Sequence, residues 1–240
     1  MWRFGSSLEE DRGLEGNLAW LLDSLEPKRS VIQALAEKHR VDFFCGFSSG
    51  GEQGGFTLSS TILIRISKFG VPLIMNLSPP LPSDEGVAGN FLTEPGLEDR
   101  KWSTAALRVI GADLRKEDIE VALDRGATHF HSSQLWLVPG GKPYCGTLWS
   151  LYSSLGDELG VTEHLRSLLD LLGPKLDVVR TLSEKYRVDI FCGFSSLSGQ
   201  GGFTLDGAFL QRIAGLRVPL GVELYLPGPV MADDTAAKME

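Results

Sequence analysis

Cysteines, long apolar runs and clustered basic residues are all scarce in this sequence. The sequence has three cysteines, Cys45, Cys145 and Cys192. A disulfide framework needs more cysteines and an even number of them, so we expect reduced thiols in a cytoplasmic protein. No run of about 18 apolar residues that could span a membrane is present. The first residues also lack the basic and apolar regions of a signal peptide. The sequence therefore predicts neither a membrane protein nor a secreted one.

The charge of the chain argues against a nucleic-acid partner. The formal net charge is −8, and the acidic residues are spread along the chain without forming a tail. Nucleic-acid binding needs clustered Lys and Arg that face the phosphates, and no such cluster is present. An acidic protein of this kind suits a basic protein partner, although mild acidity is also a common means of staying in solution.

What the sequence does contain is an internal repeat. At an offset of 147 residues, 2–80 aligns with 149–227 without a gap. The best-matching stretch is VDFFCGFSSGGEQGGFTL at 41–58, against VDIFCGFSSLSGQGGFTL at 188–205. Self-similarity of this length predicts a module that forms the same supersecondary structure twice.

The second copy predicts an α+β fold with the element order β-α-β-β-α-α-β-α-β. Apolar residues alternate over 107–111, which predicts the first strand, and Asp113 is a candidate N-cap for a helix that stops at Gly126. The remaining elements are expected at 129–138 and 144–153 (strands), 161–172 and 176–186 (helices), 188–194 (buried strand), 206–215 (helix) and 220–224 (strand). We expect helices packed on a mixed or antiparallel sheet.

The first copy is shorter, since it has no counterpart of the first two strands and the first helix. We expect an incomplete copy at 1–80, a linker at 81–102, a complete copy at 103–228 and a flexible tail at 229–240. An incomplete copy leaves a sheet edge and apolar helix faces uncovered. Three explanations are open: a start upstream of Met1, a truncated copy that packs on the complete one, or completion by another chain.

Four stretches of the second copy carry a resemblance to a known family. They are IGADLRKEDIEVAL, LWSLYSS, ELGVTEHLRSLLDLLGP and GGFTLDGAFLQRIAGLRVPLGVELY, which lie within 105–225. This segment resembles the bacterial DUF4279 domain, a family of unknown function, and the first copy resembles it over its C-terminal two thirds. The resemblance implies a small intracellular α+β domain. Some members of the family lie beside toxin-immunity genes, and the resemblance therefore also implies a binding role. It implies no active site, cofactor or substrate.

The glycine-rich segment of each copy is a candidate anion or small-ligand site. A strand, a Gly-rich loop and a helix N-terminus together can offer backbone N–H groups to an anion. The candidate residues are Ser48, Ser49, Gln53, Gly54, Gly55, Ser195, Ser196, Gln200, Gly201 and Gly202. Neither a P-loop lysine nor a dinucleotide fingerprint follows, so the alternative is a structural loop.

The motifs that suggest catalysis or metal binding are incomplete. The G-x-S-x-G match at 46–50 lacks the sharp strand-to-helix turn of a hydrolase, because more residues follow before the helix. His129 and His131 would place both rings on one face of a strand, and with Cys145, Asp124 or His164 they are weak candidates for a metal site.

We therefore expect a non-catalytic, protein-binding and immunity-like tandem module, whose two copies can pack on each other. A ligand or anion sensor that uses the Gly-rich segments is the alternative. An enzyme that uses a thiol or a metal at the histidine pair is the third hypothesis. We expect no catalytic residue and no cofactor.

Overall fold

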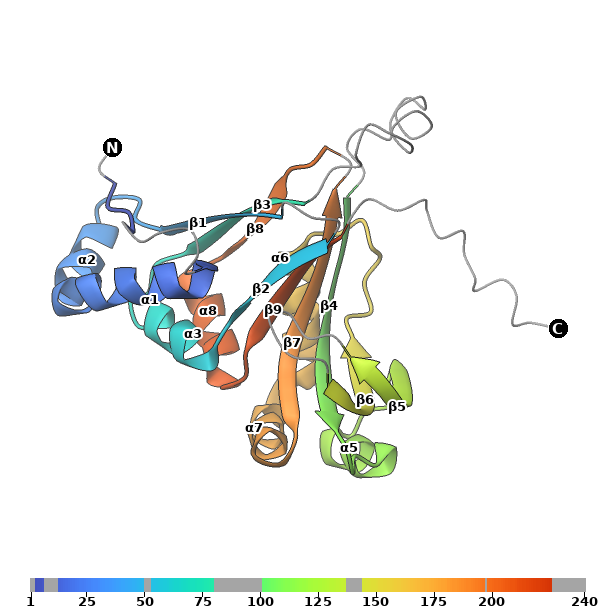
Figure 1. The fold of residues 1–240 in the computed structure, drawn as a ribbon. Helices are drawn as coiled ribbons and strands as arrows, with labels where there is room; N and C mark the ends of the chain where they lie inside the picture. The colour runs from blue at the N-terminus through green and yellow to red at the C-terminus, as the bar shows by residue number, and fades with distance from the viewer. Residues whose placement is uncertain are drawn as a thin grey trace, which may run out of the picture.

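The computed structural model describes residues 3–6, 13–49, 53–79, 101–136, 144–196 and 198–225. These residues form two β-sheets with helices packed on them, which is an α+β fold (Figure 1). The helices are α1 (Gly13–Leu25), α2 (Arg29–Ala36), α3 (Ser60–Ser67), α5 (Lys116–Leu123), α6 (Val161–Leu172), α7 (Leu176–Lys185) and α8 (Gly207–Gly215). The strands are β1 (Phe43–Ser48), β2 (Gln53–Leu58), β3 (Leu73–Ser78), β4 (Lys101–Gly111), β5 (His129–Trp136), β6 (Tyr144–Tyr152), β7 (Arg187–Ser196), β8 (Gly201–Leu205) and β9 (Leu220–Tyr225).

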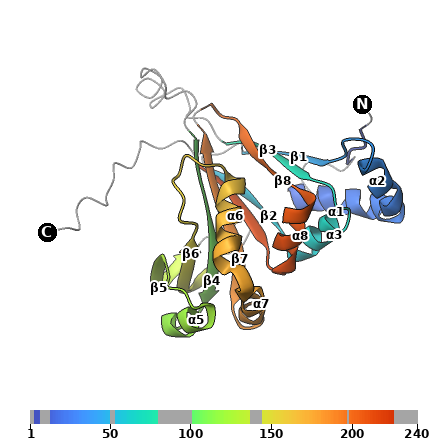
Figure 2. The same cartoon turned by 180° about the vertical axis from the view of Figure 1, so that it is seen from behind.

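The helices form where the apolar residues repeat at helical spacing. In α6 the buried stripe consists of Val161, His164, Leu165, Leu168, Leu169 and Leu172. The helix ends where Gly173 adopts a φ of 42° and Pro174 follows, because neither residue continues an α-helix easily. Helices α6 and α7 lie on one face of the larger sheet (Figure 2).

The helix that follows β4 begins and ends differently from the prediction. Asp113 does not cap it: the N-cap residue of α5 is Arg115, whose side chain makes no capping bond. The helix ends at Asp124, which takes a left-handed φ of 54°, and not at Gly126. The Glu120 carboxylate accepts a hydrogen bond of 2.8 Å from the Ala127 N–H, which fixes this early exit from the helix.

The larger sheet has six strands in the order β2-β9-β7-β4-β6-β5. Strand β7 runs parallel to β9 and antiparallel to β4, so it is central. From Val188 to Ser196 every described residue of β7 is buried, which confirms the prediction of a central strand buried on both faces. The smaller sheet has the order β1-β3-β8, with β1 parallel to β3 and β8 antiparallel to it.

The two halves of the chain exchange one strand each. We call residues 13–79 the N-terminal half and 101–225 the C-terminal half. Strand β2 follows β1 in sequence but pairs with β9 of the C-terminal half, with Leu58 opposite Leu220. Strand β8 follows β7 but pairs with β3 of the N-terminal half, with Leu205 opposite Leu73. Both sheets therefore contain strands from both halves.

The same offset of 147 residues that aligns the sequence also relates the elements. The order α1, α2, β1, β2, α3, β3 recurs as α6, α7, β7, β8, α8, β9. An ion pair recurs with them: Arg65 binds Asp23 at 2.7 Å, and Arg212 binds Asp170 at 2.7 Å. Helices α3 and α8 pack against each other beside the exchanged strands (Figures 1 and 2).

Several predicted boundaries change. The Gly-rich segments, predicted as loops before a helix, contain the exchanged strands β2 and β8. Strand β4 begins at Lys101, inside the predicted linker 81–102. Residues 81–100 of that linker, residues 139–143 between the two predicted strands and the tail at 229–240 lie outside the described residues. Within the described ranges, no helix is long and apolar enough to cross a membrane.

Candidate functional site

A buried ion pair lies where β4 pairs with β7. Arg108 faces Asp189 across the two strands and donates two hydrogen bonds to its carboxylate, of 2.8 and 3.0 Å. The two side chains are only 11% and 7% exposed. The guanidinium carbon also lies 4.5 Å from the centre of the Phe191 ring. Arg108 thus has both a carboxylate and an aromatic face as partners.

Acidic and phenolic groups surround this ion pair. Burial alone would lower the pKa of Arg108, but the Asp189 carboxylate and, more weakly, Glu223 raise it overall. Tyr225 donates a hydrogen bond to Glu223, and burial together with that bond raises the pKa of Tyr225. Burial also raises the pKa of Tyr152. Arg108 therefore stays charged, and both phenols stay protonated, throughout the physiological pH range.

The N-terminal half contains counterparts of the aspartate and the phenylalanine that contact Arg108, but no counterpart of Arg108 itself. At the 147-residue offset, Asp189 corresponds to Asp42 and Phe191 to Phe44. Phe191 is 6% exposed, whereas Phe44 is 64% exposed. Asp42 is paired at 3.2 Å with Arg40, which is itself exposed on the surface. Phe44 is exposed because no described strand plays the role of β4 beside β1.

Helix α2 shows the same difference from its counterpart. Leu182 of α7 is 9% exposed, but Leu35, at the equivalent position of α2, is 47% exposed. Val31 of α2 is exposed as well. No residue of α2 is buried, while α7 buries Val179 and Leu182. We call Val31, Leu35, Asp42 and Phe44 the β1–α2 surface.

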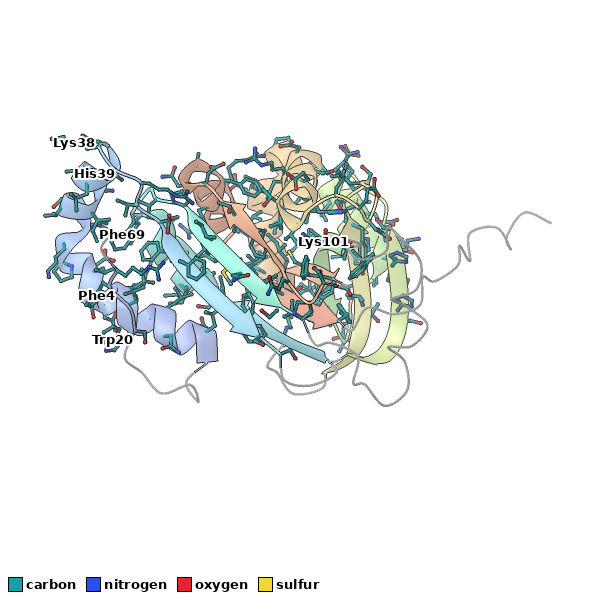
Figure 3. The ribbon with its side chains drawn as sticks, turned by 90° about the horizontal axis from the view of Figure 1, so that it is seen from above. Phe4, Trp20, Lys38, His39, Phe69 and Lys101 are labelled. Carbon is teal, nitrogen blue, oxygen red and sulfur yellow. The ribbon has the colours of Figure 1, made fainter. Side chains whose placement is uncertain are left out.

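An aromatic pair that includes Trp20 of α1 lies partly in solvent. Phe4 stacks on Trp20 with ring centres 5.8 Å apart (Figure 3). Figure 3 also places Lys38 and His39, which follow α2, far from Lys101 at the start of β4. The strand β4 of the C-terminal half is therefore remote from the end of the N-terminal half that carries α2.

The glycines of the predicted ligand site lie in paired strands. A Cβ at Gly55 would lie 2.5 Å from the carbonyl oxygen of Val222, and one at Gly202 would lie 2.0 Å from that of Met75. A Cβ at Gly201 would meet the Phe194 ring at 2.2 Å. Glycine is thus required where the exchanged strands β2 and β8 approach the backbone of the strands they pair with and the Phe194 ring. That these residues also bind a ligand stays a prediction.

The polar members of the same set lie at the ends of β1 and β7. Ser48 and Ser195 are strand residues, and Ser49 lies within contact of Gly54, where a Cβ would come 2.3 Å from its Oγ. The Ser196 hydroxyl donates a 2.8 Å hydrogen bond to the Gln200 carbonyl and closes the turn before β8. The side chain of Gln53 lies outside the described residues.

The helices that follow these strands are capped by their own side chains. Ser59 accepts a hydrogen bond of 3.3 Å from the Ile62 N–H, and Asp206 accepts one of 2.8 Å from the Phe209 N–H. Asp206 therefore caps α8, which lies within the range 206–215 predicted as a helix. Each cap satisfies one of the amide donors that a helix N-terminus could offer to an anion.

The two histidines of the H-x-H motif lie on one face, as predicted. The rings of His129 and His131 are stacked with centres 6.5 Å apart, and His129 also meets the Tyr152 ring edge-on at 5.0 Å. Among the residues that the structure describes, no group of three or more His, Cys, Asp and Glu could hold a metal ion. The side chain of Cys145, one suggested third ligand, lies outside them.

A buried serine–histidine pair is a feature that the sequence did not predict, since His164 was expected only as a possible third metal ligand. His164 is 1% exposed, and its Nδ1 lies 2.5 Å from the Ser153 hydroxyl. At the equivalent positions of the N-terminal half, Ser6 donates a hydrogen bond to Asn17. Because a serine–asparagine link serves the same purpose there, we interpret the pair as a structural tether. The apolar stripe of α6 includes position 164, and this signal could have revealed its burial.

His164 predicts an acid-sensitive stability. Burial lowers its pKa, although Asp157 acts in the opposite direction. Between the ordinary pKa of about 6.5 and the lower folded value, the unfolded chain binds the proton and the folded chain does not. The contribution of His164 to the free energy of unfolding is fully present above pH 6.5. Below that pH it falls by up to about 1.4 kcal/mol per pH unit. We expect His164→Asn to lose less stability than the wild type between pH 7.5 and 5.5 in urea unfolding.

His39→Asn, at an exposed position, supplies the control for the substitution itself. Equal losses of stability in the wild type and in His164→Asn would show that the tether does not titrate as described.

Cys45 on β1 and Cys192 on β7 are buried. Burial raises the pKa of Cys45 to about 12, and burial also raises the pKa of Cys192. A nucleophilic cysteine needs a lowered pKa, since the thiolate is the reactive form. Neither thiol is therefore suited to nucleophilic attack at neutral pH.

Thiol labelling tests this conclusion. In a Cys145→Ser background, Cys45 and Cys192 should remain unlabelled by a thiol-reactive dye at pH 8, and both should react in denaturant. Rapid, stoichiometric labelling of either residue in the folded protein would contradict the buried, protonated thiols.

Sequence comparison gives the family but no characterised relative. A search of curated proteins and a search of solved structures each find no match. The family model of DUF4279, described as a domain of unknown function, matches residues 1–78 and 100–227. Both matched segments include the exchanged strands and the elements related by the 147-residue offset. The chain belongs to the DUF4279 family.

Proposed function

We propose that the chain is a tandem, protein-binding module, in which the N-terminal half presents the β1–α2 surface to a partner protein. One observation carries this proposal: equivalent residues of the two halves differ in burial. Phe191 and Leu182 are 6% and 9% exposed, while Phe44 and Leu35 are 64% and 47% exposed. The repeated sequence keeps large apolar side chains at positions that are buried only when a further strand and helix lie beside them.

The strand edge beside Phe44 supports the same function. Among the described strands, β1 pairs with β3 alone, so its other side is an edge. Native proteins protect such edges with lysine, proline or a bulge, because an unpaired edge invites another strand. The β1 sequence FFCGFS contains none of these residues. Phe44 on this edge strand and Val31 and Leu35 on α2 are large apolar side chains that the described residues leave exposed.

The charge of the chain indicates the kind of partner. With a net charge of −8 and with Asp42 on the β1–α2 surface, a basic partner is favoured over an acidic one. An immunity-like function, in which the chain covers and blocks a basic protein, is one form of this activity.

A capture experiment with surface variants tests the proposal. Tagged wild type is used as bait in a lysate of the native host, beside Phe44→Asp, Leu35→Asp and the control Val121→Asp. Val121 is exposed on α5, away from the β1–α2 surface. We expect a stoichiometric basic partner that the wild type and Val121→Asp retain and that the other two variants lose. Equal retention by all four proteins would refute a binding function for this surface.

A further inference from the structure

We propose that the open side of β1 receives an antiparallel β-strand of a partner protein. This strand carries an arginine opposite Asp42, with an apolar residue on each side of that arginine. The inference rests on the proposed function and names the chemistry of its partner. Its template is the strand pairing that the C-terminal half already makes within the chain.

That template is β4 against β7. Arg108 lies directly opposite Asp189 in the antiparallel register, binds its carboxylate through two hydrogen bonds and covers the Phe191 ring at 4.5 Å. The neighbours Leu107 and Val109 point to the other face of the sheet and are fully buried. The strand that satisfies β7 thus has the pattern apolar–Arg–apolar.

The N-terminal half repeats the receiving groups of that template. Asp42 and Phe44 occupy the positions of Asp189 and Phe191. Phe44 lies on β1, the strand that corresponds to β7, and Asp42 directly precedes β1. The present partner of Asp42 is Arg40, whose side chain is exposed. Exposed ion pairs stabilise a protein by only about 0–1 kcal/mol, so a bidentate guanidinium could displace Arg40.

The backbone of β1 is oriented to accept such a strand. The Phe43 N–H donates to the Pro72 carbonyl at 2.8 Å, as the Ile190 N–H donates to Pro219 at 2.9 Å in the C-terminal half. Because donors alternate in direction along a strand, the N–H groups of Phe44 and Gly46 point to the open side. Backbone bonds at this edge would supply affinity, and the pairing of the arginine with Asp42 would supply specificity.

The experiment uses the β4 sequence itself as the probe. A fluorescently labelled peptide of residues 101–111, KWSTAALRVIG, is titrated with the full-length protein and followed by anisotropy. We expect saturable binding that weakens about 10- to 100-fold when Arg108→Ala is made in the peptide, as for hydrogen bonds to a charged group. Asp42→Ala and Phe44→Ala in the protein should weaken binding similarly, and Val121→Ala should not. Circular dichroism confirms that each variant is folded.

The outcomes separate this inference from the proposed function. No peptide binding, or binding that ignores both the peptide arginine and Asp42, overturns the inference. If Phe44→Asp still loses the cellular partner while Asp42→Ala retains it, the protein-binding function stands and the arginine-bearing strand is refuted. If sedimentation shows that the chain dimerises and that Phe44→Asp abolishes the dimer, the occupant is a second copy and the partner strand is refuted.

Discussion

Replacing Arg108 with alanine is expected to lower the free energy of unfolding by about 3–5 kcal/mol, because it leaves the buried Asp189 carboxylate without a counter-charge. The two groups are 11% and 7% exposed, so water cannot replace the lost guanidinium. The Phe191 ring also loses the cation that covers it at 4.5 Å. Urea unfolding at pH 7 measures the loss.

The chain offers a control in the ion pair of Asp42, which is the counterpart of Asp189 at the 147-residue offset. Arg40 pairs with Asp42 at 3.2 Å but is exposed, so Arg40→Ala should cost less than about 1 kcal/mol. Replacing both members of the buried pair, as Arg108→Met with Asp189→Leu, should recover most of the stability, since no charge is then left buried. A loss below about 1 kcal/mol for Arg108→Ala alone would show that the pair is more hydrated than its exposure indicates.

The second large effect concerns the exchanged strands. Gly202→Val should unfold the protein or destabilise it by more than about 4 kcal/mol, because its Cβ would lie 2.0 Å from the Met75 carbonyl oxygen. Backbone atoms cannot move aside as a flexible side chain can, so β8 would have to leave β3. Gly55→Val at the β2–β9 contact should behave alike, since the corresponding distance is 2.5 Å.

Gly46→Val is the matched control for these two variants. Gly46 also lies in a strand, but nothing is found within 4 Å of a Cβ built there. Valine favours strands, so Gly46→Val should be neutral or slightly stabilising in thermal unfolding. If Gly202→Val is as stable as Gly46→Val, the strand exchange does not hold the two halves together.

The helices and central strands could be predicted because their signals are local. The apolar stripe of α6, the Asp206 cap and the uninterrupted apolar run of β7 all occur within a few residues of sequence. A start signal alone was less reliable: Asp113 lies in a suitable place but Arg115 takes the N-cap position. The local sequence around α5 permits either start.

The exchange of β2 and β8 could not be predicted, because the choice of partner is not a local property. The segments that form these strands, QGGFTL at 53–58 and at 200–205, are identical, so either could pair within its own half or across. The Arg108–Asp189 pair is similarly distant, since 81 residues separate its members. Phe44 and Phe191 occupy equivalent positions of the repeat but differ in burial, because β4 pairs with β7 and no described strand pairs with the open side of β1.

Amide hydrogen exchange of the isolated protein tests the central claim that β1 has an open, binding-competent edge. NMR compares the Phe44 and Gly46 amides with those of Phe191 and Gly193, their counterparts on the paired strand β7. We expect the Phe44 and Gly46 amides to exchange far faster than those of Phe191 and Gly193 in the monomer, and to exchange more slowly once the peptide of residues 101–111 is added. Equal protection of both sets in the monomer without peptide would contradict it, because β1 would then already be paired.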